Sequence, residues 1–436
     1  MSSILTNNGA MVALQTLKSI NNNLATTQGE ISTGKSVATA KDNAAVWAIA
    51  KVMEADVKGF KGISDSLNLG QSTVAVARSA SETVTDLLTE IKGKIVASQE
   101  ENVDRAKIQT DIDALRDQIS AVVGAAQFNG LNLLSNVDDT AGSGSVNVLA
   151  SLDRSGTGVA ASDITVQKQD LGTGAAAIAG TVAATDLNAA VDTLTLNATQ
   201  SDTIDIGTTN SGFEAGTAYA LNIFGTDADN STFTQTDYRE TTAAGATAAE
   251  APNLSVVYVA REGDTAADVA KGLQAAFKTF MADNGLDTDV VDATVSGDTL
   301  TFTSSLTDGT DTIQVNLVSV DAAAGNTIGG ALEQLSNLDV TSQAGADAAL
   351  DQIEGLIQTS IDSASAFGSV QGRIETQIDF VSSLTDSLRA GIGTLVDADM
   401  EEASARLQAL QVQQQLGVQA LSIANQAPQS LLSLFR

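Results

Sequence analysis

Acidic residues in the middle of the chain are the first candidates for chemistry, because carboxylates bind cations and transfer protons. Three groups of aspartates stand close together in the sequence: Asp227 with Asp229, Asp287 with Asp289 and Asp292, and Asp308 with Asp311. Oxygen-rich loops can bind calcium, and paired carboxylates can hydrolyse glycosides. None of these groups completes the calcium-loop motif D-x-[DN]-x-[DN]-G-x5-E, and no aromatic platform for a sugar accompanies them. We interpret them as solvated turn carboxylates, and the sequence predicts no catalytic, metal-binding or cofactor-binding residue.

The residue types that are missing exclude further chemistry. The 436 residues include no His and no Cys. This excludes a Ser-His-Asp or Cys-His nucleophile, the usual zinc ligands and any disulfide. The N-x-[ST] motifs at Asn197, Asn230 and Asn253 lie in a Thr-rich region where chance matches are expected, and Trp47 is expected to serve packing. We therefore predict that the protein is not an enzyme.

The charge of the chain excludes two classes of partner. It carries 22 basic and 53 acidic residues, for a formal net charge of -31, so we expect it to bind neither nucleic acid nor anionic membrane surfaces. The charge fits general solubility, and it also fits an outer surface that stays soluble at very high local density. The first residues lack the charged and apolar regions of a secretory signal, and no apolar run of 18 residues predicts a membrane span.

Apolar residues repeat every seven positions near both ends of the chain, which is the pattern of coiled-coil-like helix seams. The first row comprises Val46, Met53, Phe60, Leu67 and Val74, and it continues through Val84 with Ile91 beside Leu88 with Ile95. The second row, interrupted only by Ser360, comprises Ile353, Phe367, Ile374, Val381, Leu388 and Leu395. The rows predict a helix over 44–98, roughly 80 Å long, a second helix ending at Gly124, and a long helix within 345–396. An ordinary antiparallel bundle remains the alternative.

Short amphipathic stretches occupy the extreme ends. They contain a first row of Leu17, Leu24 and Ile31, a second row of Met400, Leu407 and Leu421 widened by Leu410, Leu416 and Ile423, and the apolar end Leu431, Leu432, Leu434 and Phe435. Isolated helices of this size are marginal in water. Their apolar faces therefore need a partner, which is either the other end of the chain or a neighbouring subunit.

The middle of the chain differs in composition from both ends. Residues 141–340 carry 26 acidic and 6 basic residues. Alternating runs such as Leu300 to Thr303, separated by Gly, Asp and Asn, are typical of strands and turns, and residues 265–282 have a helical pattern. We predict a mainly α, elongated bundle or coiled coil built from both ends, with a central α+β, β-rich outer domain.

Several segments of the two ends resemble bacterial flagellins, of the alphaproteobacterial type. They read TGKSVATAKDNAA at 33–45, QFNGLNLL at 127–134, VDADMEEASARLQALQVQQQLGVQAL at 396–421 and IANQAPQSLLSLFR at 423–436. The resemblance covers about 1–140 and 345–436. More loosely, Tyr258 to Ser304 is similar to a small insert of flagellins and hook-associated proteins, although a plain α+β packing unit is the favoured explanation.

The resemblance implies an architecture in layers. Residues 1–40 and 397–436 would pair as a terminal coiled coil lining a filament channel, 41–140 and 345–396 would form the long-helix bundle, and 141–344 would form the variable outer domain. The terminal coil would polymerise through Leu17, Leu24, Ile31, Leu407, Leu410, Leu421, Leu434 and Phe435. The bundle seam would consist of Val46, Met53, Phe60, Leu67, Val84, Ile91, Ile353, Ile374, Val381 and Leu388.

The resemblance also implies partners and a location. A flagellin polymerises helically with itself, and in some cases with other flagellins, into an extracellular swimming filament. It meets hook-associated junction and cap proteins, and it is exported unfolded by the flagellar type III route after a cytosolic chaperone has covered its C-terminal helix. The alternatives are a hook–filament junction protein, which cellular copy number would distinguish, and an exported enzyme or adhesin acting through the middle region.

One departure from the family pattern concerns animal immunity. Many flagellins carry an Arg in the first bundle helix that an innate-immune receptor binds. The corresponding stretch here is Thr89 to Lys94, in which Glu90 takes the place of that Arg. The reversed charge predicts weak or absent recognition.

Overall fold

The computed structural model describes residues 7–155, 158–179, 184–186, 194–196, 201–209, 213–241, 253–305, 311–322 and 325–434. The chain divides into two compact units. The first contains residues 1–65, 151–161 and 377–436, and the second contains 66–150 and 162–376. The mainly α class with a central sheet-containing region is confirmed.

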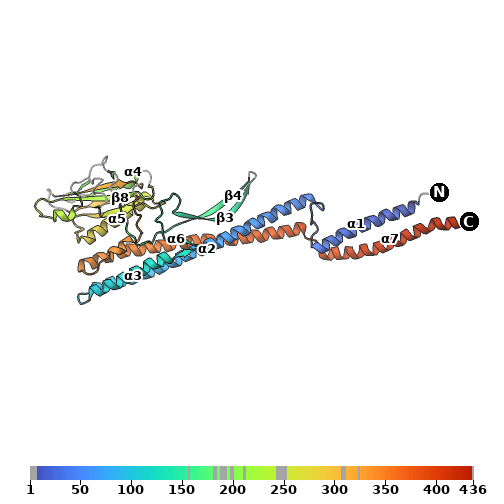
Figure 1. Ribbon diagram of the computed structural model, residues 1–436, viewed down its shortest axis with the longest axis horizontal. Coiled ribbons are helices and arrows are strands. Elements are labelled where there is room, and N and C mark those ends of the chain that lie inside the picture. The colour runs from blue at the N-terminus through green and yellow to red at the C-terminus, as the bar shows by residue number, and fades with distance from the viewer. Residues whose placement is uncertain are drawn as a thin grey trace. The chain divides into compact units, whose positions relative to one another are not determined.

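Long helices form both ends of the chain (Figure 1). They are α1 (Asn8–Thr33), α2 (Ala44–Ser98), α3 (Arg105–Ala125), α6 (Gln343–Val396) and α7 (Met400–Leu434). The predicted helix over 44–98 is confirmed to the residue, because no proline interrupts its apolar row. Of the two prolines, Pro428 lies close to the end of α7, and Pro252 lies outside the described residues.

Short connections separate the terminal helices from the long ones. Gly34 ends α1 in the left-handed conformation with φ 70°, and its N–H donates to the Glu30 carbonyl at 2.8 Å, which is a common helix C-terminus. The two connections are hydrogen-bonded to each other, because Ser36 N donates to Val396 O at 2.7 Å and Ala398 N donates to Gly34 O at 3.0 Å. The connection between α1 and α2 therefore lies beside the connection between α6 and α7.

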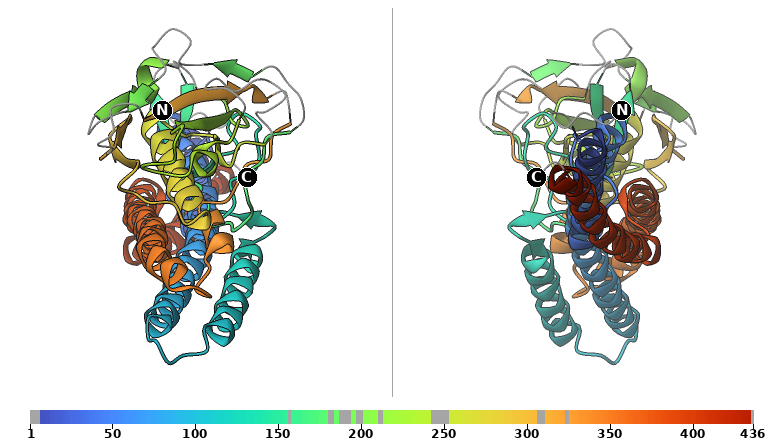
Figure 2. Two further views of the ribbon diagram at one scale, coloured as in Figure 1. Left: turned by 90° about the vertical axis from the view of Figure 1, so that its left-hand side faces the viewer. Right: turned by 90° about the vertical axis from the view of Figure 1, so that its right-hand side faces the viewer.

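The helices α2 and α6 run antiparallel. Within the second unit, Gln71 bonds Glu375 at 3.1 Å, Arg78 bonds Gln371 at 2.9 Å, and Lys92 pairs with Glu354. Residue numbers rise along α2 as they fall along α6, which fixes the direction. Viewed along the helices in Figure 2, α3 returns beside α2, and Lys94 of α2 pairs with Asp111 of α3 at 2.6 Å.

A layer of hydroxyl groups interrupts the apolar seam between α2 and α6. Ser360, which breaks the row of sevens, is fully buried. Its Oγ donates to the Ser81 carbonyl at 3.1 Å and lies 2.9 Å from Thr85 Oγ1. Hydrogen bonding satisfies these polar groups, so the break in the pattern does not break the helix pair.

The central sheet region is antiparallel throughout its described strands. A five-stranded sheet has the order β5-β12-β8-β9 with β6 also on β12, a three-stranded sheet has the order β10-β11-β7, and two hairpins are β1-β2 and β3-β4. The strands are β1 (Gln127–Phe128), β2 (Leu131–Asn132), β3 (Ser145–Ser155), β4 (Gly158–Gln167), β5 (Ala184–Asp186), β6 (Leu194–Leu196), β7 (Ser201–Asp205), β8 (Ala218–Thr226), β9 (Val256–Val259), β10 (Asp292–Ser296), β11 (Thr299–Thr303) and β12 (Thr312–Val320). Asn129 and Gly130 both have positive φ, as the tight turn between β1 and β2 requires.

The helix α5 (Ala266–Asp283) packs its apolar face on these sheets. Phe277 of α5 and Phe302 of β11 meet edge to face with centroids 5.5 Å apart, and both are fully buried. Gly272 allows α5 to approach β9, because a Cβ at this position would lie 2.1 Å from the Tyr258 ring. The predicted helix over 265–282 and the strand from 300 to 303 are confirmed. The segment Tyr258 to Ser304 is not a separate unit, since β9 pairs with β8 and β11 pairs with β7.

Candidate functional site

The pair formed by α1 and α7 is the first candidate site. Asn7 Nδ2 donates to Ala424 O at 2.8 Å, and Gln414 Nε2 donates to Asn21 Oδ1 at 2.8 Å, so the two helices run antiparallel (Figure 1). Gly417 of α7 faces α1 closely, because a Cβ there would lie 3.2 Å from Leu17 Cδ1. A small residue at this position brings the two helix axes together.

The predicted terminal residues are buried to different degrees. Leu410 is buried, and those that are half-buried are Leu17, Leu24, Ile31, Leu407 and Leu421. Leu434 is the last residue of α7, and Phe435 lies outside the described residues. Periodicity missed Ile20 and Thr27, the two buried residues of α1. The two residues are seven positions apart and form a second row beside the first. A search for apolar residues does not find this row, because Thr27 carries a hydroxyl group.

Large apolar side chains remain exposed on both helices of this pair. Exposure reaches 64% for Val12 and 69% for Ile423. Other exposed members are Met11, Leu14, Val412, Leu416 and Val418. Soluble monomers rarely leave such a concentration of apolar side chains in water, and an exposed apolar patch marks an interaction surface.

The predicted seam residues of the long helices divide between the two units. Those that are buried are Leu67, Val84, Ile91, Ile353, Ile374 and Val381, and those that are half-buried are Val46, Met53, Phe60 and Leu388. Glu90 is exposed on α2. Phe380 of α6 is 56% exposed although it directly precedes buried Val381, so this aromatic side chain faces solvent.

The structure groups the acidic residues differently from their spacing in the sequence. Asp227, Asp229 and Asp311 have carboxylate oxygens within 4.8 Å of one another, although Asp311 is distant in the chain. Four backbone N–H groups, among them those of Thr232 and Phe233 at 2.9 Å, donate to the Asp227 carboxylate. Burial alone would raise the pKa of Asp227, but these hydrogen bonds lower it to about 2. The carboxylate organises its own loop, as expected of a turn residue, but the expectation that it is solvated is wrong, because Asp227 and Asp311 are both only 1% exposed. Backbone N–H groups take the place of water around Asp227, and Asp308 lies outside the described residues.

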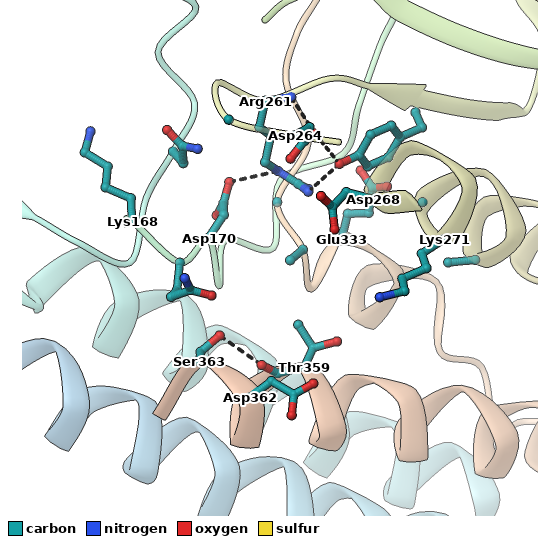
Figure 3. Close-up of a pocket in the computed structure, with 18 of the residues that line it drawn as sticks. Lys168, Asp170, Arg261, Asp264, Asp268, Lys271, Glu333, Thr359, Asp362 and Ser363 are labelled. Carbon is teal, nitrogen blue, oxygen red and sulfur yellow. Dashed lines mark hydrogen bonds and ion pairs between the residues drawn. The ribbon is translucent and has the colours of Figure 1, made fainter. Parts of the chain in front are cut away.

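A polar cavity of about 510 Å³ lies in the second unit. Arg261 extends toward Asp170 in this cavity, as Figure 3 shows, with Nε 3.3 Å from the Asp170 carboxylate. The guanidinium also donates to the Gly329 carbonyl at 2.7 Å and to Tyr258 Oη at 3.0 Å. Tyr258 donates to Asp264 at 2.6 Å. No periodic pattern in the sequence indicates this group.

Burial perturbs the ionisation of the groups around Arg261. It raises the pKa of Asp170, of Asp264 and of Glu333, against the lowering effect of the guanidinium charge. Burial alone would lower the pKa of Arg261, but Tyr258 and the carboxylates raise it above its ordinary value.

Comparison with known proteins identifies the family of the chain. Residues 4–139 match the bacterial flagellin N-terminal helical region, and residues 350–435 match the bacterial flagellin C-terminal helical region. The chain is 35% identical to Flagellin A of Rhizobium meliloti and 30% identical to a flagellin of Brucella melitensis, with 100% of both chains covered in each case. The chain belongs to the bacterial flagellin family. It is a structural subunit of the flagellar filament, of the alphaproteobacterial type.

Solved structures add little beyond this. The FliC structure from Burkholderia pseudomallei is 15% identical with a TM-score of 0.30, and the alignment covers 70% of this flagellin and 99% of that chain. Hook-associated protein 3 from Legionella pneumophila gives 12% identity and a TM-score of 0.34, covering 79% and 98% of the two chains. Scores this low do not establish a common arrangement of the whole chain. Within the described residues, no helix is both long and apolar enough to cross a membrane.

Proposed function

We propose that the α1–α7 pair is the polymerisation element of this flagellin and that neighbouring subunits cover its exposed apolar side chains in the filament. The observation that supports this most directly is the exposure of Val12 and Ile423 on a helix pair that is otherwise joined along its seam. Covering apolar surface at about 25 cal/mol per Å² is the main driving force available to a subunit that forms no disulfide.

The predicted residues take two roles in this proposal. Leu17, Leu24, Ile31, Leu407, Leu410 and Leu421 hold the pair together from their buried and half-buried positions, and Leu434 and Phe435 extend the apolar end. The seam residues of α2 and α6 hold the next layer, whose outer side meets adjacent subunits. Residues 1–40 with 397–436 then line the channel, 41–140 with 345–396 surround them, and 141–344 face the medium.

The test uses substitutions in α7. Ile423→Asp should leave the monomer helical, because the side chain is exposed there, and should block seeded polymerisation, because burying an unpaired charge is costly. Leu407→Asp and Leu421→Asp should also block it. Ser422→Asp, an exposed neighbour with the same added charge, is the matched control. Normal filaments of Ile423→Asp in negative-stain microscopy would refute the proposal.

The remaining aspects of the function follow from the family and the composition. The protein acts mechanically and catalyses no reaction, and the filament it forms lies outside the cell. Subunits are exported unfolded by the flagellar type III route, and a cytosolic chaperone covers α7 before export. Junction and cap proteins of the hook-associated class meet the filament ends, and no cofactor, nucleic acid or membrane takes part. Pull-down of the chaperone by full-length protein, lost when 397–436 are removed, tests the chaperone contact.

Glu90 makes this flagellin a weak ligand for the animal receptor that binds an Arg at the corresponding position. Its carboxylate is exposed on α2 and raises the pKa of Lys94 by its charge, after the larger effect of Asp111. Glu90→Arg should increase the response of a receptor reporter assay. Full potency of the unsubstituted protein would contradict the proposal.

A further inference from the structure

Two chain segments connect the central sheet region to the helices, and we call them the neck. The inbound segment is 168–176, after β4, and the outbound segment is 329–333, before α6. They lie in direct backbone contact, because a Cβ on Gly330 would lie 1.9 Å from the Gly172 carbonyl oxygen. Gly330 N donates to Gly174 O at 2.8 Å, and Leu332 N donates to Gly172 O at 2.9 Å.

Arg261 joins the two segments of the neck. It belongs to neither, since it lies in the turn between β9 and α5. Its guanidinium reaches the inbound segment at Asp170 and the outbound segment at the Gly329 carbonyl, to which both Nε and one terminal nitrogen donate, at 3.1 and 2.7 Å. The side chain is only 12% exposed and that of Asp170 only 3%, so water competes little for these contacts.

The next residue of the same turn extends the connection toward α3. The Glu262 carbonyl accepts from Asn136 Nδ2 at 3.1 Å, and its carboxylate accepts from Gly142 N at 2.8 Å. The inbound segment is bonded to the residues after α3 as well, through Gln169 N to Leu133 O at 2.9 Å and Leu171 N to Leu134 O at 3.1 Å. A single turn therefore contacts the inbound segment, the outbound segment and the residues that follow α3.

We propose that Arg261 is the clamp that fixes the central sheet region to the long helices, and that without it the neck opens while both parts stay folded. Removing one partner of a buried ion pair leaves an uncompensated charge, here on Asp170 and the nearby Glu333, and this penalty falls on the neck. The sheet core formed around Phe277 and Phe302 contains Tyr258, which accepts from Arg261, but it contains neither Arg261 nor the two neck residues that Arg261 binds, Asp170 and Gly329.

Amide hydrogen exchange of the full-length monomer tests the clamp. Arg261→Gln should accelerate exchange at Leu171, Gly330 and Leu332 by roughly 150- to 4,000-fold, the range that corresponds to loss of a buried ion-pair partner. Amides of β8, β12 and α2 should keep their rates. Arg239→Gln is the matched control, because Arg239 donates to Gly225 O at 2.6 Å and lies over the Phe224 ring, within the sheet region.

A second substitution separates a charge effect from a packing effect. Adding Asp170→Asn to Arg261→Gln removes one of the unpaired carboxylates, so the double variant should exchange at the neck at least threefold more slowly than Arg261→Gln alone. Equal or faster exchange in the double variant would show a packing role and overturn the proposal. Unchanged neck exchange in Arg261→Gln, or equal acceleration throughout the sheets, would overturn it as well.

Discussion

Substitutions in the seam between α2 and α6 should destabilise the protein to different degrees. The reason is that one row of the seven-residue repeat contains both an aromatic residue and a residue with a hydroxyl group. Phe367 is 1% exposed, and Ser360 in the same row is fully buried. Phe367→Ala should lower the free energy of unfolding by about 3–5 kcal/mol through lost burial and a cavity. Ser360→Ala should lower it by only ~1 kcal/mol, because Thr85 Oγ1 keeps its own acceptor, the Ser81 carbonyl at 2.9 Å.

Urea unfolding of the monomer, followed by circular dichroism at 222 nm, measures both changes in the free energy of unfolding. The two variants should share the slope of that free energy against urea concentration. Phe380→Ala is the matched control, since the same residue type in the same helix is 56% exposed. It should cost less than about 0.5 kcal/mol. A loss below about 1 kcal/mol for Phe367→Ala with an unchanged slope would refute the assignment of this row to the core of the pair.

Three further predictions concern the central region and its connection. Gly272→Ala should destabilise the sheet region by about 1–3 kcal/mol, because the new methyl group overlaps the Tyr258 ring. Its control Gly93→Ala, with open space on helix α2, should stabilise the protein by roughly 0.5–1 kcal/mol in the same urea assay. The pKa of Asp227 is lowered from 3.8 to about 2, so its contribution to stability is present above pH 3.8 and is lost as the pH falls toward 2. When Tm is measured against pH, Asp227→Asn should reduce the fall in Tm between pH 3.8 and 2. An unchanged fall in Tm would show that the hydrogen bonds to Asp227 do not cause it. Deleting about 150–335 should leave polymerisation largely intact in negative-stain microscopy, whereas loss of filaments would place an assembly contact in the sheets.

The long helices could be predicted from the sequence because their determinants are local. Apolar residues such as Leu67 and Val74 recur every seven positions with no proline between them. Connections rich in polar residues mark the ends of the helices. The strands carry a weaker signal. Leu300 to Thr303 is recognisable as a strand, but its partner β7 lies almost a hundred residues earlier, at Ser201–Asp205. Pairing over such a distance depends on the core that both strands share with α5, in which Ile204, Leu300 and Phe277 are buried together, and no local pattern contains it.

The clamp residues could not be predicted for a related reason. Arg261, Asp170 and Gly329 come from three separate segments and have no fixed spacing. In the sequence, Arg261 is one of the six basic residues among 26 acidic ones between 141 and 340, and it resembles a solvated surface charge. Only the turn after β9 and the crossing of the two neck segments bring these groups together and away from water.

The same seven-residue repeat leads to different burial in the two helical layers, and this difference separates folding from assembly. Between residues 66 and 98, α2 packs against both α3 and α6, so Leu67, Val84 and Ile91 are buried completely or nearly so. Among the described residues, α1 and α7 pack mainly against each other, and two helices can cover a narrow seam but not a wide apolar face. Leu416 and Ile423 lie beyond that seam and remain exposed. An apolar repeat thus predicts that one face of a helix will be buried against a partner. The apolar side chains that stay exposed in the monomer show which part of that face requires a second subunit for its burial.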